Sequence, residues 1–137
     1  MKSVPKGSIY PSLTYNDPHV AIEWLCRVFG FAKRLVVPNE DGGVLHSELS
    51  MGDVVVMISS PRPEARRISP QELDGVHQVL SLHILDPDAH HAHAVREGAE
   101  IVQPLEDAEF GARGYGARDL EGHCWFFSTY IPGIYWD

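Results

Sequence analysis

Apolar residues recur at helical spacing in two stretches of the chain, and each stretch follows an Asp-Pro pair and precedes a glycine. In the first stretch, the Asp17 carboxylate is placed to accept the free N–H groups of a first helical turn, and Pro18 suits the position after this cap. The apolar face stops at Gly30, where a left-handed residue favours helix termination. This pattern predicts a helix over residues 18–29. Its predicted apolar face consists of Val20, Ala21, Trp24, Leu25, Val28 and Phe29.

The second stretch repeats the first with a thinner apolar face. Asp86 and Pro87 begin it and Gly98 ends it, so the sequence predicts a helix over residues 87–97. The apolar face of this helix is predicted to consist of Ala89, Ala92, Val95 and Ala99.

Three pairs of landmarks indicate two copies of one module. The two cap aspartates are 69 residues apart, the two helix-ending glycines 68, and Gly52 and Gly122, which begin later strands, 70. Residues 60–75 carry three prolines and predict a linker, and residues 104–113 predict a loop. Short apolar or alternating runs predict strands at 8–15, 33–37, 44–50, 54–59, 77–85, 100–103, 114–118 and 123–130. Each module therefore reads βαβββ, which favours an α+β fold.

Composition excludes several classes of protein. The 137 residues predict one domain, and the net charge of −8 without a basic stripe argues against nucleic acid and anionic membrane as partners. The longest apolar run, residues 54–58, is too short to span a membrane. Residues 1–5 contain no apolar segment, so we expect no signal peptide. Cys26 and Cys124 are too few for a disulfide scaffold, and we expect a reduced, cytoplasmic protein.

Two sequence motifs make the chain similar to a known superfamily. The first, from Asp17 to Phe31, reads DPxxAxxWLxxxFGF, and the second, from Tyr115 to Trp125, reads YGARDLEGHCW. With the two βαβββ copies, they resemble the vicinal-oxygen-chelate superfamily of glyoxalase I, bleomycin-resistance proteins and extradiol dioxygenases, and bleomycin-resistance-like members most closely. The resemblance implies a single domain, 1–137, whose modules form a curved, mostly antiparallel sheet around a cleft. Module one spans 8–60, the linker 61–75 and module two 76–131.

The resemblance also implies where a metal would bind. Metal-dependent members hold a divalent ion with a His, Glu or Gln from the first and last strands of each module, and these positions fall on Tyr10, Val56, Val79 and Phe126. None of the four offers the imidazole or carboxylate that such an ion prefers. If each assigned position is shifted by one residue along the chain, Gln78 is the only metal ligand gained. This departure favours metal-free, drug-binding members without a cofactor over glyoxalases and dioxygenases, which need the ion.

Strand alternation predicts which side chains face the cleft. Phe126 is expected at its floor and Tyr115 at its mouth, while Trp125 and Phe127 alternate away from the cleft and are expected to pack under the helices. The mixture of aromatic, apolar and hydroxyl side chains is typical of a pocket for an organic molecule, and the alternative is that these residues fill the concavity as core. The predicted ligand-binding residues are Tyr10, Ser12, Thr14, Val56, His77, Val79, Ser81, Tyr115 and Phe126.

Histidines and arginines leave further alternatives open. A substitute metal site would use His46, His77 or His83, which otherwise are structural imidazoles. The second predicted helix carries a cluster that either captures a metal ion or belongs to a solvated helix face. Arg113 and Arg118 either hold an anionic or planar ligand group, or Arg118 pairs with a neighbouring acid of its turn, Asp119 or Glu121. The helix cluster is His90, His91 and His93.

The hypothesis favoured by these patterns is a protein that binds a small organic molecule, with planar or cationic metabolites and antibiotics as candidates, in a metal-free cleft. The alternative is a metal-dependent lyase, isomerase or dioxygenase of the same superfamily with a non-standard ligand set. Bare strand edges and the apolar segment 134–136 predict a homodimer related by a two-fold axis.

Overall fold

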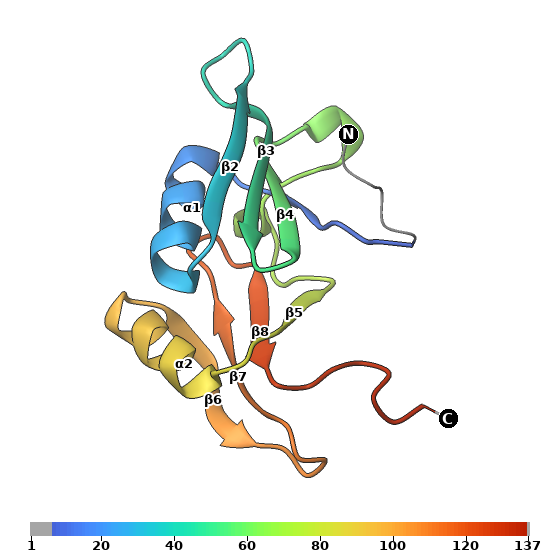
Figure 1. Ribbon diagram of the computed structural model, residues 1–137. Helices are drawn as coiled ribbons and strands as arrows, with labels where there is room; N and C mark the ends of the chain where they lie inside the picture. Colours follow the sequence, from blue (N-terminus) through green and yellow to red (C-terminus); the bar gives the residue numbers. More distant parts are fainter. Residues whose placement is uncertain (1–6, 137) are drawn as a thin grey trace.

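A computed structural model describes residues 7–136, and in it the chain folds as two βαβββ modules (Figure 1). The stretch on which the expected absence of a signal peptide rests, residues 1–5, lies outside the described residues. Module one consists of β1 (Ser12–Thr14), α1 (Pro18–Trp24), the π-helix η1 (Leu25–Phe29), β2 (Ala32–Pro38), β3 (Val44–Met51) and β4 (Val54–Ser59). Module two consists of β5 (Val79–His83), α2 (Pro87–Arg96), β6 (Glu100–Asp107), β7 (Arg113–Arg118) and β8 (Cys124–Ser128). The linker contains two short 3₁₀ helices, Pro63–Ala65 and Pro70–Glu72.

Each module forms one four-stranded mixed sheet, in the order β1-β4-β3-β2 for module one and β5-β8-β7-β6 for module two. The first and last strands of each module pair in parallel, and the other pairs are antiparallel. The predicted α+β class and the two βαβββ modules are therefore confirmed. Within residues 7–136, no helix is long and apolar enough to cross a membrane.

The predicted caps of both helices are confirmed. The side chains of Asp17 and Asp86 accept hydrogen bonds from the backbone N–H groups of Val20 (3.2 Å) and Ala89 (3.0 Å). The first helix does not stay α-helical to its end, because its last five residues form η1 before the left-handed Gly30.

Two strand predictions need correction. The first strand is shorter than the predicted 8–15, because only residues 12–14 pair with β4. The predicted loop 104–113 is wrong in its first half, because β6 continues to Asp107. Pro104 is tolerated there, since β6 is an edge strand and a register shift separates Gln103 from Glu106.

One apolar cluster contains side chains of both modules, and both helices lie on the same side of the molecule in Figure 1. Phe29 of η1 packs against Trp125 and Phe127 of β8, with ring centroids 5.5 and 4.8 Å apart. Trp125 and Phe127 are fully buried, so their predicted position under the helices is confirmed.

The buried face of α2 differs from the prediction. Ala89, Ala92 and Val95 are exposed, whereas Ala94 is buried and His90 and His93 hydrogen-bond backbone carbonyl oxygens of module one. The alanines offer little apolar area, while the imidazoles find hydrogen-bond partners that offset the cost of their burial. The expectation of a solvated histidine face is therefore wrong.

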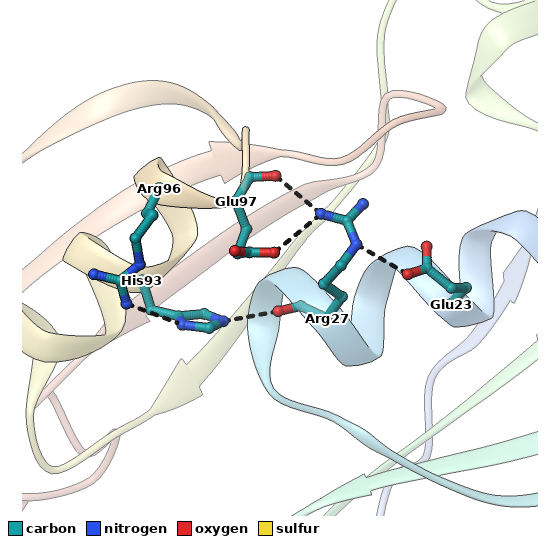
Figure 2. A network of polar contacts seen from close by, with 5 residues as sticks. All are labelled: Glu23, Arg27, His93, Arg96 and Glu97. Carbon is teal, nitrogen blue, oxygen red and sulfur yellow. Dashed lines mark hydrogen bonds and ion pairs between the residues drawn. The ribbon is translucent and has the colours of Figure 1, made fainter.

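Polar contacts join the two helices across the modules (Figure 2). The Arg27 guanidinium bonds Glu23 on its own helix (2.9 Å) and Glu97 at the end of α2 (3.3 Å). His93 donates from Nε2 to the Arg27 carbonyl oxygen (2.8 Å) and accepts a longer bond from Arg96 (3.4 Å). These contacts hold the end of η1 against α2.

Two buried carboxylates in the turn between β7 and β8 also join the modules. Asp119 accepts hydrogen bonds from the Tyr15 hydroxyl (2.6 Å) and the Trp125 indole (3.0 Å), and from three backbone N–H groups of its own turn. Glu121 accepts from the backbone N–H groups of Asn16 (2.6 Å) and Asp17 (2.9 Å) just before α1. Module two thus satisfies backbone groups at the start of the helix of module one.

Candidate functional site

The face of each sheet opposite the helices carries most of the predicted site. Ser12 pairs with Met57 in the sheet of module one, and Ser81 pairs with Phe126 in the sheet of module two. Paired residues point to the same face, which in both modules is the face away from the apolar core. Thr14, two residues after Ser12, points the same way.

Val56 does not belong to this face. Its side chain is 1% exposed and lies in the core with Leu49, its partner on β3. The position in module one that corresponds to Phe126 is Met57, five residues after Gly52, whereas Phe126 is four after Gly122. Because successive strand residues alternate in direction, this one-residue difference reverses the expected orientation.

Tyr115 does not lie at the mouth of a cleft either. It is fully buried, and its hydroxyl donates to Nδ1 of His90 (2.6 Å), whose Nε2–H donates to the carbonyl oxygen of Phe29 (2.8 Å). Burial raises the pKa of Tyr115 and lowers the pKa of His90, so both stay neutral near pH 7. The pair connects the two modules instead of contacting solvent.

Two hollows follow segment 8–14, which precedes and includes β1, along the seam between the modules. The first, about 620 Å³, is bounded by Tyr10, Pro11 and Val55 on one side and by Leu80 and Ser81 of β5 on the other. The second, about 340 Å³, brings together several hydroxyl, imidazole and guanidinium groups. Its polar lining consists of Ser12, Thr14, Arg66, Arg67, His77, Gln78 and His123. A larger hollow of about 720 Å³ lies between α1 and β2 and contains none of the predicted site residues.

The predicted site residues are thus distributed over different places. Tyr10 and Ser81 line the first hollow, and the backbone of the buried Val56 borders it. Ser12, Thr14 and His77 line the second hollow. Val79 is 58% exposed and Phe126 is half-buried, and both lie on the open sheet face beyond the two hollows.

Sequence reasoning missed a hydrogen-bonded pair on the same sheet face of module one. His46 donates from Nε2 to Glu48 Oε2 (2.7 Å), and Glu48 pairs across the sheet with Met57. Strand alternation could have identified this pair, because His46 and Glu48 are two positions apart in a predicted strand and therefore share a face. Nδ1 of His46 remains available as an acceptor in this arrangement.

The alternative of a substitute metal site receives no geometric support within residues 7–136, where no three His, Cys, Asp or Glu side chains form a potential metal site. At the four positions where the resemblance implies ligands, the side chains that face away from the core are a phenol, a thioether, an isopropyl group and a phenyl ring. They belong to Tyr10, Val79, Phe126 and, in place of the buried Val56 that the resemblance implied, Met57. This donor set does not fit a hard or borderline divalent cation.

The two arginines of β7 are already paired. Arg113 bonds Asp88 (2.7 Å) and Asp107 (3.2 Å), and Arg118 bonds Glu100 (2.5 Å). The alternative in which Arg118 pairs with an acid of its own turn is therefore wrong, since Arg118 bonds Glu100 and both of those carboxylates have partners in module one.

The fold of two βαβββ modules, with hollows along the seam between them, is shared by one superfamily of proteins. The sequence model of the Glyoxalase/Bleomycin resistance protein/Dioxygenase superfamily matches residues 9–127, and the chain belongs to this superfamily. Among solved structures, TioX from Micromonospora sp. ML1 is similar, with 38% identity, coverage of 91% of this chain and 100% of TioX, and a TM-score of 0.73.

Two more distant structures share the fold. The bleomycin-binding protein of Streptomyces verticillus, solved with copper(II)-bleomycin, is 21% identical over 91% of this chain and 97% of its own, with a TM-score of 0.64. The fosfomycin resistance protein FosX from Mesorhizobium loti is 14% identical over 94% and 96%, with a TM-score of 0.67. At these identities, the similarity establishes the fold alone.

Proposed function

We propose that this protein binds a small organic molecule without a metal ion, in the cleft that runs along β1 and over the adjoining sheet face. The observation that carries the proposal is the side-chain set at the four superfamily ligand positions, which is aromatic and apolar where metal-dependent members have donors. Hollows of about 620 and 340 Å³, which are lined by Ser81 and Ser12 of the same sheet face, match the size of a drug-like ligand or its parts. The bleomycin-binding relative supports an antibiotic as one candidate.

Phe126 and Met57 offer a matched test of this proposal, because they occupy corresponding positions in the two modules. A stacked aromatic contact contributes about 0.5–1.5 kcal/mol beyond its buried area, so Phe126→Leu should weaken binding of a planar ligand about tenfold. Met57→Leu keeps volume and polarity and should change affinity less than about threefold. Calorimetric titration with bleomycin and a panel of planar aromatic antibiotics provides the measurement.

The same titration can overturn the assignment. If one of these compounds binds, and the Phe126→Leu and Tyr10→Leu variants bind it as tightly as the wild type, the ligand lies elsewhere. Elemental analysis of untagged protein tests the absence of metal. One tightly held equivalent that disappears in His77→Ala, but survives replacement of the α2 histidines, would contradict the metal-free proposal.

A second candidate function is catalysis by the His46–Glu48 pair. The carboxylate fixes the imidazole with its Nε2–H toward Glu48, which leaves Nδ1 as a potential general base on the site face. A metal-independent activity that His46→Gln abolishes, while ligand affinity stays unchanged, would favour this candidate over binding alone.

We further propose that the protein is a homodimer. Large apolar side chains remain exposed in the single chain, among them Ile9 and the C-terminal Ile134, Tyr135 and Trp136, the last at 84% exposure. Segments 7–11 and 129–136 extend away from the helices in Figure 1, where a second copy can cover them. Light scattering at micromolar concentration should give twice 15.3 kDa, and the monomer mass would reject the proposal.

A further inference from the structure

Two arginines and two histidines gather at one hollow of a chain whose net charge is −8. The 340 Å³ hollow beside β1 is lined by Arg66, Arg67, His77 and His123, and within the described residues its lining contains no Asp or Glu. The two arginines give this hollow a local charge that is opposite in sign to the net charge of the whole molecule. Because electrostatic interactions weaken with distance and salt, the groups at the hollow decide which ligand group is preferred there.

The Arg67 guanidinium is positioned by neutral partners. Its Nη2 donates to Ser12 Oγ (2.5 Å) and, at the longer distance of 3.5 Å, to Ser59 Oγ. No ion pair connects Arg66 or Arg67 to a carboxylate of residues 7–136, in contrast to Arg27, which contacts Glu23 and Glu97. The charge of Arg67 is therefore not compensated by the described part of the protein.

The backbone holds the two arginines in a tight turn. Arg62 and Arg67 exchange both backbone hydrogen bonds (2.8 and 3.0 Å), which closes the segment between them into a small hairpin. Arg66 has a φ of +59°, the only positive φ of a non-glycine residue within residues 7–136. This conformation costs about 1 kcal/mol or more for a residue with a Cβ, and such local strain is concentrated at functional sites.

Further donors surround the guanidinium. The Ser12 and Thr14 hydroxyls and the His77 imidazole line the same hollow. His123 donates from Nε2 to the Thr14 carbonyl oxygen (2.9 Å), which fixes its ring against β1. None of the three linker acids lines this hollow, since Glu64 is exposed outside it, Glu72 accepts from Asn16 and Asp74 lines a separate hollow.

We propose that this hollow binds the oxyanion of an organic ligand, a carboxylate or a phosphate, and that Arg67 is its principal contact. The proposal rests on the proposed function in one respect, since Ser12, Thr14 and His77 are among the ligand-binding residues expected there. A planar guanidinium matches the two oxygens of a carboxylate or phosphate and gains strength from the charge. Segment 8–14 borders both hollows, with residues 8–11 at the first and β1 at the second, so an oxyanion at Arg67 places the apolar part of the same ligand toward Tyr10.

The test compares probes that differ in charge and share a ring. Benzoate, phenyl phosphate and neutral benzamide are titrated into ¹⁵N-labelled protein, and amide and arginine Nε resonances are followed. Both anions should shift the resonances of residues 66–68 and 77 with saturation, whereas benzamide should bind these residues at least about tenfold more weakly. A shift with only one anion identifies that group as the preferred oxyanion.

Arg67→Gln and Arg62→Gln form the matched pair of variants. Arg67→Gln keeps a donor for Ser12 and removes the charge, so anion affinity should fall about tenfold or more. Arg62 belongs to the same hairpin but does not line the hollow, and its replacement should change affinity less than about twofold. Thermal unfolding of each variant checks that the fold is retained, and His77→Gln provides a second, exposed replacement if Arg67→Gln is unstable.

Two results would overturn the inference. Anions that shift no saturable resonances near residue 67, or that bind Arg67→Gln and His77→Gln as tightly as the wild type, exclude an oxyanion site in this hollow. Failure of the inference is distinct from failure of the proposed function. If planar antibiotics bind through Phe126 and the anions do not bind, the proposed function stands and the oxyanion site is rejected. If the anions bind and no antibiotic binds, the oxyanion site stands and the proposed function is rejected.

Discussion

The two modules share one backbone arrangement and differ in the turn that precedes their last strand. In module one, two residues, Gly52 and Asp53, connect β3 to β4, and Asp53 is exposed. In module two, five residues connect β7 to β8, and two of them, Asp119 and Glu121, are buried carboxylates that bond module one. The repeated strands and helices produce each module, whereas the longer turn of module two adds buried polar contacts between the modules.

A second difference lies on the site face. Gly116 pairs with Phe126 as Glu48 pairs with Met57, so Gly114 and Gly116 of module two correspond to His46 and Glu48 of module one. One module thus presents a hydrogen-bonded pair of polar side chains, and the other presents bare backbone beside an aromatic ring. A cleft built from both modules receives its polar and its aromatic components from different halves of the repeat.

The largest expected effect follows from removing the buried carboxylate of the longer turn. Asp119→Ala leaves the Tyr15 hydroxyl, the Trp125 indole and three backbone N–H groups without their acceptor, and should lower the free energy of unfolding by about 3–5 kcal/mol. Asp53→Ala in the shorter turn should stay within about 0.5 kcal/mol. Urea denaturation of both variants measures the difference, and equal losses would refute the unequal roles of the turns.

A smaller effect is expected from adding one methyl group to module two. A Cβ at Gly114 would lie 2.5 Å from the Phe127 carbonyl oxygen, so Gly114→Ala should cost about 1–3 kcal/mol through displaced backbone. The corresponding His46 is partly exposed, and His46→Ala should cost about 0.5 kcal/mol or less. If Gly114→Ala unfolds at the same urea concentration as the wild type, the close approach of β7 and β8 is not a constraint.

The two modules should also differ in how their stability depends on pH. His90 of module two occupies the position that corresponds to the buried Ala21 of module one, 69 residues earlier in the chain. Burial lowers the pKa of His90, so below about pH 6.5 the unfolded chain binds a proton that the folded chain does not. Stability is therefore complete above the unfolded pKa and falls as the pH decreases through it. The loss between roughly pH 7.5 and pH 5.5 should be smaller in His90→Gln than in the wild type. Equal slopes in the two proteins would exclude His90 as a source of the dependence.

The smallest expected effect distinguishes Arg27 from Arg96, which are also 69 residues apart. Arg27 bonds Glu97 of the other module, whereas Arg96 bonds only His93 of its own helix among the contacts of residues 7–136 (Figure 2). Arg27→Gln should lower the melting temperature slightly and reduce its dependence on salt, and Arg96→Gln should do neither. A larger effect of Arg96→Gln would mean that the contact across the modules contributes less than the contact within α2.

The sequence by itself determined the elements, their caps and the duplication. Asp17 and Asp86 cap their helices as expected, and the strands lie close to their predicted positions, because N-caps and apolar periodicity act over a few residues. Periodicity also assigned Trp125 and Phe127 to the core. These are local properties, and any chain segment with the same pattern has the same preference.

Only the tertiary structure decided which way individual side chains point. Val56 is buried because Ser12 pairs with Met57, and a register between strands that are more than forty residues apart is not encoded in either strand alone. Tyr115 and His90 are buried because each satisfies the other within module two while His90 also bonds the Phe29 carbonyl oxygen of module one, which no spacing along the chain reveals. The arginine-lined hollow likewise forms only when the linker hairpin folds back against β1, since distant segments supply its donors.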